Sequence, residues 1–290
     1  MLEPEIILIV DNVYPIINET SINLFLCGKK ISEEKSIRKI LIEKYKEHKR
    51  INIILPEWIF NELFDKPEYD LISLENILAE DVDKIVLPIE SYGTACELGA
   101  FSIKTEICEK LIVITEEKYK NSSSFLRYGP MKLVKNSKGH ILYYRENEID
   151  KLVKQVIDKT IYVKYEQKRR FNIFNISLLI GLIVIILQPI QKSKLIRIVK
   201  EITNEDERIS AAIEILIQKE YLEVIPITSH DSKISLNENG YQYFFNLIKL
   251  HSRERLVNKL RANTIWTNRK KQHIFRGDIE RAKLLEKTSK

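Results

Sequence analysis

The stretch KIVLPIESYGTACELGAF, residues 84–101, decides the fold of this chain. It begins with an apolar run, KIVLPI (84–89), which is typical of a buried strand. A loop that carries Gly93 follows, and TACELGAFSIK (94–104) then predicts a helix that starts at about Thr94. A strand, a short loop and a helix in this order form the repeating unit of α/β proteins with parallel sheets.

The same order recurs on both sides of this stretch. Four further apolar runs predict strands: INLFLC (22–27), INIIL (51–55), LIVIT (111–115) and ILYY (141–144). Helices are expected at 31–45 with Ser32 as N-cap, at 73–80, and from Glu146 to about Lys168, whereas 1–20 is ambiguous between strand and helix. This alternation predicts a doubly wound parallel sheet with its functional loops at the carboxyl ends of the strands.

The pattern changes near residue 170. Residues 171–190 are almost all apolar, but polar side chains interrupt the run, so a buried core helix is favoured over a membrane segment. Helices at 193–202, 205–222 and 237–250 and a hairpin formed by LEVIPI and KISL are expected to follow. Their order resembles a winged helix, although its recognition helix would begin with the acidic run Glu205-Asp206-Glu207.

Composition excludes several classes of protein. The chain has 290 residues, of which 44% are hydrophobic and 30% are charged, so it is neither disordered nor fibrous. Three cysteines and an N-terminus without a basic region or a small-residue cleavage site predict a cytoplasmic protein without a signal peptide. The five histidines are scattered, and we expect neither a metal nor a cofactor.

Positive charge is concentrated at the C-terminus. Residues 251–290 hold 12 Lys/Arg and 4 Asp/Glu, a balance of +8, whereas the whole chain carries +6. Trp266 adds an aromatic ring to this segment, which favours a polyanionic partner such as nucleic acid. The alternative is a solvated helical tail. The basic residues that we expect to bind the partner are Arg253, Arg255, Lys259, Arg261, Arg269, Lys270, Lys271 and Arg276.

Glu97 is the candidate catalytic residue. The predicted strand and loop place it in the first helical turn at the carboxyl edge of the sheet, where the helix dipole favours a carboxylate. An ionised carboxylate in such a cleft can attack an anomeric carbon and form a covalent glycosyl intermediate. The alternative is structural, because Thr94 and Glu97 also have the spacing of a capping box.

Several segments together resemble one enzyme family. SYGTACELGAF, LFLCG (24–28), NIILPE (52–57), SLENILAEDVDKIVL (73–87) and RYGP (127–130) are similar to segments of the nucleoside 2-deoxyribosyltransferase family, over roughly residues 22–145. The run from SLENILAE to ELGAFS, followed by SFLRYGPMKLV, resembles more closely the deoxyribosyltransferase-like effectors encoded beside retron reverse transcriptases. Those effectors also carry a C-terminal winged-helix-like region.

The resemblance implies roles for individual residues. Glu97 would be the nucleophile, and Glu75 would hold or protonate the nucleobase with one methylene more than the aspartate usual there. Ser91 replaces a second aspartate of the transferases, which favours water as the acceptor and therefore an N-glycosidase. The residues implied in substrate binding are Phe25, Gly28, Ser91, Gly93, Thr94 and Tyr128. A tight turn and cap are the alternative for Gly93 and Thr94, and packing is the alternative for Tyr128.

The fold class expected is α/β, a flavodoxin-like doubly wound parallel sheet (nucleoside deoxyribosyltransferase-like) followed by an α+β winged-helix-like domain. The expected domains are catalytic (1–168), winged-helix-like (169–250) and a basic C-terminal helical tail (251–290).

The resemblance implies the toxic effector of a retron anti-phage defence system, an N-glycosidase or (deoxy)ribosyltransferase acting on a deoxynucleotide or NAD. Retron reverse transcriptase, its msDNA and its non-coding RNA would be the restraining partners. A homodimer or higher assembly is expected, without a membrane. The alternative is a DNA-binding winged-helix regulator whose α/β domain only senses a nucleotide.

Overall fold

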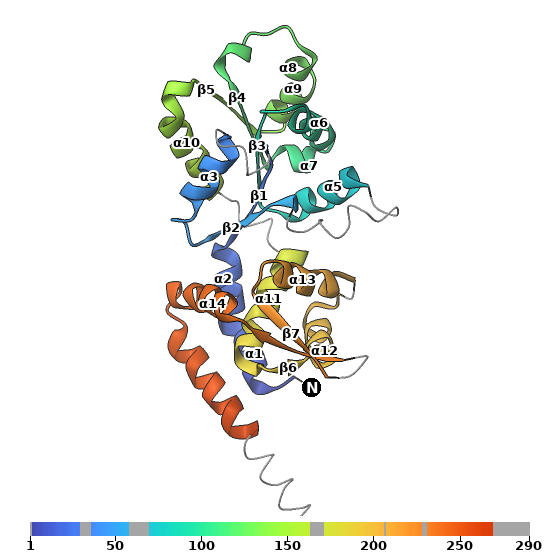
Figure 1. Cartoon of the computed structure of the whole chain (residues 1–290), viewed down its shortest axis with the longest axis vertical. Helices are drawn as coiled ribbons and strands as arrows, with labels where there is room; N and C mark the ends of the chain where they lie inside the picture. Colours follow the sequence, from blue (N-terminus) through green and yellow to red (C-terminus); the bar gives the residue numbers. More distant parts are fainter. Residues whose placement is uncertain are drawn as a thin grey trace, which may run out of the picture. The chain divides into compact units, whose positions relative to one another are not determined.

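The computed structural model describes residues 2–29, 36–57, 70–162, 171–205, 207–227 and 231–268. The chain divides into two compact units (Figure 1). One unit is Asn18–Asn175, and the other combines the chain up to Ile17 with the chain from Ile176 onward. Each unit is described in turn.

A five-stranded parallel sheet forms the centre of the first unit (Figure 1). Its strands are β1 (Ile22–Leu26), β2 (Ile51–Ile54), β3 (Lys84–Pro88), β4 (Leu111–Glu116) and β5 (His140–Tyr144), and all five were predicted from the sequence. The strand order is β2-β1-β3-β4-β5, and every neighbouring pair is parallel. The order reverses between β1 and β3, which is the point where doubly wound proteins bind ligands.

Helices cover both faces of this sheet. On one face, α3 (Ile37–Tyr45) and α10 (Ile149–Ile161) pack together over an apolar core that includes Leu24, Leu26 and Val86. On the other face lie α5 (Leu71–Asp81), α6 (Tyr92–Phe101), α7 (Thr105–Cys108) and α9 (Pro130–Asn136) (Figure 1). Short helical turns fill the remaining loops: η1 (Glu117–Tyr119), α8 (Phe125–Tyr128) and η2 (Glu146–Glu148).

Helix boundaries differ from the sequence predictions. Helix α3 begins at Ile37, with Ser36 as its N-cap, because the Ser36 hydroxyl accepts a hydrogen bond from the Lys39 amide at 3.1 Å. The predicted cap, Ser32, lies outside the described residues. Helix α5 begins two residues early, because Asp70 caps it and accepts from the Ser73 amide at 2.8 Å.

The second unit is mainly helical, with a small antiparallel sheet of order β6-β8-β7. Its elements are α1 (Pro4–Asn12), α11 (Ile173–Leu187), β6 (Ile190–Gln191), α12 (Lys192–Thr203), α13 (Glu207–Gln218), β7 (Leu222–Pro226), β8 (Ser232–Leu236), α14 (Glu238–Leu250) and a helix at 254–268. The predicted hairpin is therefore confirmed, and the ambiguous stretch 1–20 forms two helices, α1 and α2 (Tyr14–Thr20).

Helix α11 is the core helix of the second unit, as its apolar run predicted. Residues 179–187 of this helix are all hydrophobic or glycine and are buried. A side chain at Gly181 would overlap the Phe244 ring of α14, because its Cβ would lie 2.0 Å from the nearest ring atom. In the described part of the chain, every helix is too short or too polar to cross a membrane.

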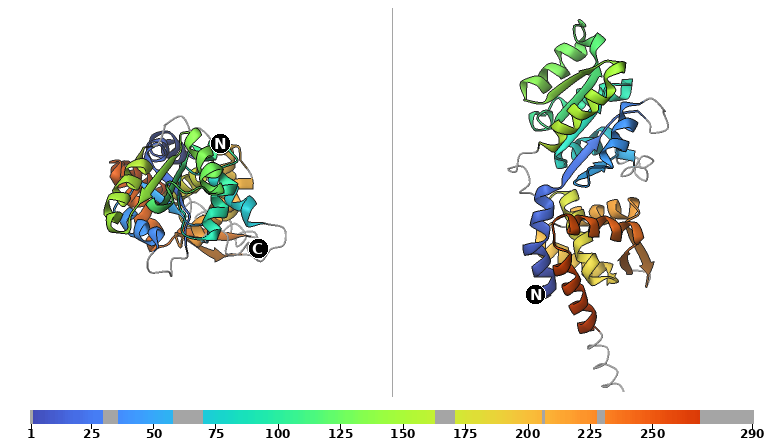
Figure 2. Two further views of the ribbon diagram at one scale, coloured as in Figure 1. Left: turned by 90° about the horizontal axis from the view of Figure 1, so that it is seen from above. Right: turned by 90° about the vertical axis from the view of Figure 1, so that its left-hand side faces the viewer.

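The N-terminal helix groups with the C-terminal segments rather than with the sheet. Glu3 forms an ion pair with Lys194 at 2.7 Å, and Arg253 donates a hydrogen bond to the Asn12 carbonyl oxygen at 3.2 Å. These contacts join α1 to α12 and to the start of helix 254–268. In Figure 2, α1 lies with the C-terminal elements of its unit. The spatial units therefore differ from the predicted domains 1–168, 169–250 and 251–290, whose functional assignment stays a prediction.

Candidate functional site

Helix α6 begins directly after β3, at the point where the strand order reverses. Ser91 is its N-cap, and the Ser91 hydroxyl accepts from the Thr94 amide at 3.2 Å. The Thr94 hydroxyl accepts in return from the backbone amides of Ser91 at 3.0 Å and Glu90 at 3.1 Å. The capping box is thus Ser91–Thr94, and the alternative Thr94–Glu97 box is wrong because the helix begins two residues earlier than predicted.

The Glu97 carboxylate is consequently free of a capping role. It lies in the second turn of α6 rather than the first. Its Oε2 atom is buried and has no hydrogen-bond partner among the residues that the structure describes. Burial raises the pKa of the Glu97 carboxyl, while a hydrogen bond from the Cys27 thiol and the charge of Arg38 partly offset this effect. A buried carboxylate oxygen without a hydrogen-bond partner is unusual in folded proteins, and binding of a ligand or a catalytic role accounts for such an atom.

Glu75, from α5, is the second carboxyl group of the site. Its side chain is 7% exposed. Burial, followed by the nearby charges of Glu97 and Glu57, raises the pKa of Glu75 to about 8, whereas Arg38 lowers it. Glu75 therefore holds a proton near neutral pH. Two interacting carboxyl groups whose environments separate their pKa values are the usual basis for an acid and a nucleophile in one site.

A buried ion pair completes the group. Arg38 of α3 is fully buried and binds both carboxylate oxygens of Glu57, at 2.5 and 2.6 Å. Burial alone would raise the pKa of Glu57, but the hydrogen bonds and charge of Arg38 hold this pKa below its usual range. The charge of Arg38 thus lowers the pKa values of Cys27, Glu75 and Glu97 alike, which indicates that these groups lie near one another at the carboxyl ends of the strands.

The sequence of the chain matches that of a known protein family. Residues 34–224, which include Glu75 and Glu97, match the model of the STM3845 retron effector protein family. The chain belongs to this retron effector family.

Two Escherichia coli proteins are similar to this effector. One is the candidate ribosyltransferase/DNA-binding protein of retron Ec86, 39% identical over 140 residues, which cover 47% of this chain and 45% of the relative. The other is the candidate ribosyltransferase/DNA-binding protein of retron Ec73, 32% identical over 134 residues, which cover 43% of this chain and 42% of the relative. The chain therefore matches less than half the length of either relative.

The other predicted site residues of the effector are dispersed. Phe25 is completely buried against Phe101, with ring centroids 6.0 Å apart, and so offers no surface to a ligand. Gly28 follows Cys27, with a φ of 137° that favours glycine. Ser91 and Gly93 are exposed at the start of α6, whereas Thr94 is buried beneath the loop. Tyr128 is 59% exposed on α8, and within the described part of the chain its ring and hydroxyl contact Arg127 rather than Glu97.

Sequence reasoning missed three members of this group: Cys27, Arg38 and Glu57. Arg38 did leave a signal, because it stands in helical register with Leu41 and Tyr45 on the buried face of α3. An arginine on such an apolar face needs an anionic partner. The sequence does not say that this partner is Glu57, which follows a different strand.

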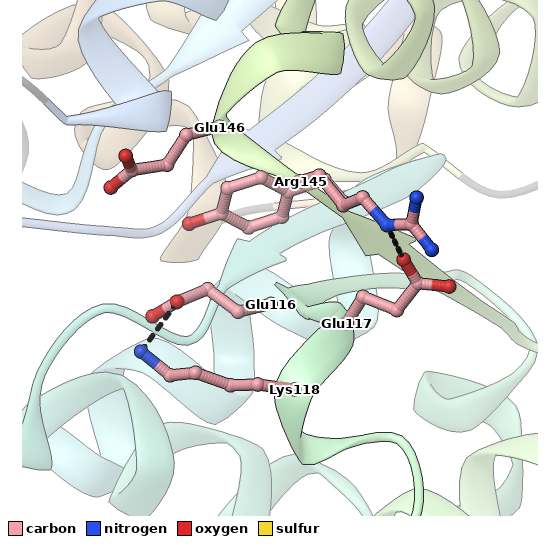
Figure 3. Close-up of a pocket in the computed structure, with 6 residues that line it drawn as sticks. Glu116, Glu117, Lys118, Arg145 and Glu146 are labelled. Carbon is pink, nitrogen blue, oxygen red and sulfur yellow. Dashed lines mark hydrogen bonds and ion pairs between the residues drawn. The ribbon is translucent and has the colours of Figure 1, made fainter.

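A depression lies at the same edge of the sheet, over β4 and β5 (Figure 3). Two ion pairs line it, Lys118 with Glu116 at 2.5 Å and Arg145 with Glu117. Burial and the charges of Glu116, Glu90 and Glu146 raise the pKa of Tyr144 to about 12. Exposed ion pairs of this kind contribute little to stability, and the residues that line this depression include none of the carboxylate site, so it adds no chemistry to that site.

The basic residues of the effector's C-terminal segment lie partly within the described structure. In helix 254–268, Val257, Leu260 and Thr264 are buried, whereas Arg255 and Lys259 are exposed. Arg261 lies over the Tyr241 ring, 5.3 Å from its centroid, and Arg253 binds the Asn12 carbonyl. Arg269, Lys270, Lys271 and Arg276 lie outside the described residues.

Proposed function

We propose that this retron effector is an enzyme that cleaves, or transfers across, the N-glycosidic bond of a nucleotide-like substrate. The observation that carries the proposal is the buried Glu75 and the half-buried Glu97, whose charges interact beside the point where the strand order reverses. The β2-β1-β3-β4-β5 order supports a flavodoxin-like, deoxyribosyltransferase-like domain. The names of the two retron relatives, which include ribosyltransferase, agree with this chemistry.

The proposed reaction has two steps. In the first, a Glu97 carboxylate oxygen attacks the anomeric carbon and the bond to the base nitrogen breaks. The base of a deoxynucleotide leaves with the proton of Glu75, whereas the nicotinamide of NAD, cationic while bound, leaves as a neutral base without that proton. In the second, the oxygen of a water molecule attacks the same carbon while the ionised form of Glu75 takes a proton from that water. The ester bond breaks, which releases the Glu97 carboxylate. Ser91 serves as the N-cap and supplies no carboxylate, which favours water over a second base as the acceptor. Deoxynucleotides and NAD are the substrates proposed.

Glu97→Gln tests the nucleophile. The purified variant is expected to fold normally but lose base release by several powers of ten, because an amide cannot form the glycosyl ester. Base release is measured by chromatography after incubation with deoxynucleosides, their monophosphates and NAD. Glu116→Gln, at the neighbouring depression, is the matched control and should retain activity. A Glu97→Gln variant as active as the parent would contradict the proposal.

We also propose that the effector is a cytoplasmic toxin, restrained by retron reverse transcriptase and msDNA, and acts as a homodimer or higher assembly. The order α11, β6, α12, α13, β7, β8 and the β6-β8-β7 sheet support a winged-helix-like region. Glu205, just before α13, is unfavourable for contact with phosphates even though it pairs with Arg208, whereas the exposed cations Arg255 and Lys259 favour such contact. We therefore assign the nucleic-acid contact to helix 254–268 and the basic residues after it.

A further inference from the structure

Arg38 is held from three directions at the carboxyl end of β1. Its two terminal nitrogens bind the Glu57 carboxylate at 2.5 and 2.6 Å. The Nη1 atom also donates to the carbonyl oxygens of Gly28 at 3.3 Å and Lys29 at 3.1 Å. The loop can approach this closely because residue 28 is glycine, where a Cβ atom would lie 2.8 Å from the Arg38 Cβ. The guanidinium is thus fixed before any substrate arrives.

This fixed charge acts on every reactive group of the site. It lowers the pKa of Cys27, of Glu75 and of Glu97, in each case against the larger effect of burial. Glu57 acts on Glu75 and Glu97 in the opposite direction. The groups around Glu97 therefore come from four segments: Cys27 after β1, Arg38 on α3, Glu57 after β2 and Glu75 on α5.

We propose that Arg38 is a positioning residue of the glycosidic reaction, whose clamped guanidinium provides the fixed positive charge beside which the Glu97 carboxylate reacts. This inference rests on the proposed function, because it assigns a role within the same site. Arg38 is fully buried, so its guanidinium offers no exposed surface to a substrate. It acts through Glu97, and Glu57 limits its effect by neutralising part of its charge.

The physical consequence concerns both steps of the reaction. Glu97 is an anion before the attack, a neutral ester in the intermediate and an anion again after hydrolysis. A nearby positive charge that cannot be solvated favours the anionic forms. Arg38 therefore keeps Glu97 ionised at lower pH in the free enzyme and makes it a better leaving group when water attacks the ester.

Two substitutions should shift the pH dependence in opposite directions. Arg38→Met is expected to move the acidic limb of kcat/KM to higher pH, by roughly one unit, because Glu97 loses a neighbouring cation. Glu57→Gln is expected to move that limb to lower pH, because it removes a neighbouring anion. The double variant Arg38→Met/Glu57→Gln should lie between the two. An effect on folding alone would not produce shifts of opposite sign.

A second measurement does not need turnover. Carboxyl-carbon NMR of protein labelled with [13C]glutamate reports the titration of Glu97 directly, with Glu97→Gln to assign its resonance. Lys46→Met and Glu43→Gln, an exposed pair at the C-terminal end of α3, are the matched controls and should leave the titration unchanged. Should Arg38→Met fail to fold, the downward shift in Glu57→Gln and the position of the double variant still decide the question.

The outcomes separate the two proposals. If the parent releases no base from any substrate but Glu97 titrates as expected in the variants, the proposed function fails and the electrostatic role of Arg38 stands. If the parent is active but Glu57→Gln and the double variant leave both the pH profile and the Glu97 titration unchanged, the role of Arg38 is overturned.

Discussion

Glu75 and Glu97 are the same residue type, yet their surroundings favour different protonation. Glu75 lies on α5, is almost completely buried and faces the negative charges of Glu97 and Glu57. Glu97 lies on α6 and alone receives a hydrogen bond from the Cys27 thiol, whereas Arg38 and Glu57 act on both carboxyl groups, Arg38 lowering and Glu57 raising their pKa values. These surroundings favour the proton on Glu75, whose pKa is raised to about 8, and the negative charge on Glu97.

Glu75→Gln is expected to stabilise the protein at alkaline pH but not at acid pH. The pKa of Glu75 is about 8 in the folded chain against an ordinary 4.5, so between these values the folded state holds a proton that the unfolded state has lost. The free energy of unfolding of the parent therefore falls as the pH rises through this window. The glutamine variant cannot ionise and keeps that stability. Urea unfolding at pH 5 and pH 9 checks the prediction.

Glu80→Gln is the matched control for this experiment, because Glu80 is on the same helix but forms an exposed pair with Lys104. Its effect on the free energy of unfolding should be small at both pH values. An equal effect of Glu75→Gln at pH 5 and pH 9 would show that Glu75 is not held neutral by its surroundings.

The sequence predicted only part of this residue-scale chemistry. The strand-loop-helix pattern placed Glu97 at the correct edge of the sheet, and the resemblance singled out Glu75. Arg38 and Glu57 are 19 residues apart and belong to segments that meet only in the folded sheet, so no local pattern could pair them. Phe25 stands at an aromatic position of the motif, but strand alternation turns it into the core against Phe101.

At the scale of elements, the start of α6 is what separates the catalytic and structural interpretations of Glu97. Both Ser91–Thr94 and Thr94–Glu97 have cap-forming residues at suitable spacing, so the sequence could not choose between them. The structure begins the helix at Tyr92 and thereby assigns the cap to Ser91 and Thr94. The same difficulty affected α3. The sequence has serines at 32 and 36, the prediction used Ser32 as the N-cap, and the structure uses Ser36.

Thr94→Val should reveal which pair caps α6. Valine keeps the shape of this buried side chain but removes the hydroxyl that accepts from the Glu90 and Ser91 amides. We expect the free energy of unfolding to fall by about 1 kcal/mol, because the Glu90 and Ser91 amides lose the acceptor that caps the helix. Glu97→Gln should cause no comparable decrease. Thermal and urea unfolding of both variants give the comparison, and the reverse ranking would restore the Thr94–Glu97 cap.

The hydrophobic pattern predicted the strands and the core helix more reliably than the capping residues predicted where helices begin. It located all five strands of the sheet and identified α11 as a buried helix, because long apolar runs have few alternative placements. It did not find α7, α8 or α9, which are only four to seven residues long and have too few turns for a helical period to emerge.

At the scale of the whole molecule, the proposed chemistry and the proposed nucleic-acid contact belong to different units. The carboxylates and the Arg38–Glu57 pair are all within Asn18–Asn175, whereas helix 254–268 belongs to the other unit. Val257, Leu260 and Thr264 anchor that helix on one side. Arg255 and Lys259, one helical turn apart, are exposed and available to phosphates.

Replacing these cations should weaken nucleic-acid binding without affecting catalysis. Arg255→Gln/Lys259→Gln, and separately Arg269→Gln/Lys270→Gln/Lys271→Gln, are expected to reduce affinity for the reverse transcriptase–msDNA complex and to flatten its salt dependence. The slope of log affinity against log salt should fall by roughly 0.7–0.9 for each phosphate that the variant no longer neutralises. Fluorescence anisotropy at several salt concentrations measures this slope, and base release by the free variants should match the parent.

The variants also predict the direction in which toxicity to the cell should change. If the complex restrains the effector, weaker binding should increase toxicity, and adding Glu97→Gln to the same variant should abolish it. Lys46→Gln, which removes an exposed cation at the end of α3 in the other unit, is the matched control and should leave binding and toxicity unchanged. Association that is insensitive to salt, or variants that bind as tightly as the parent, would move the interface away from these cations and leave helix 254–268 as a solvated, packed helix.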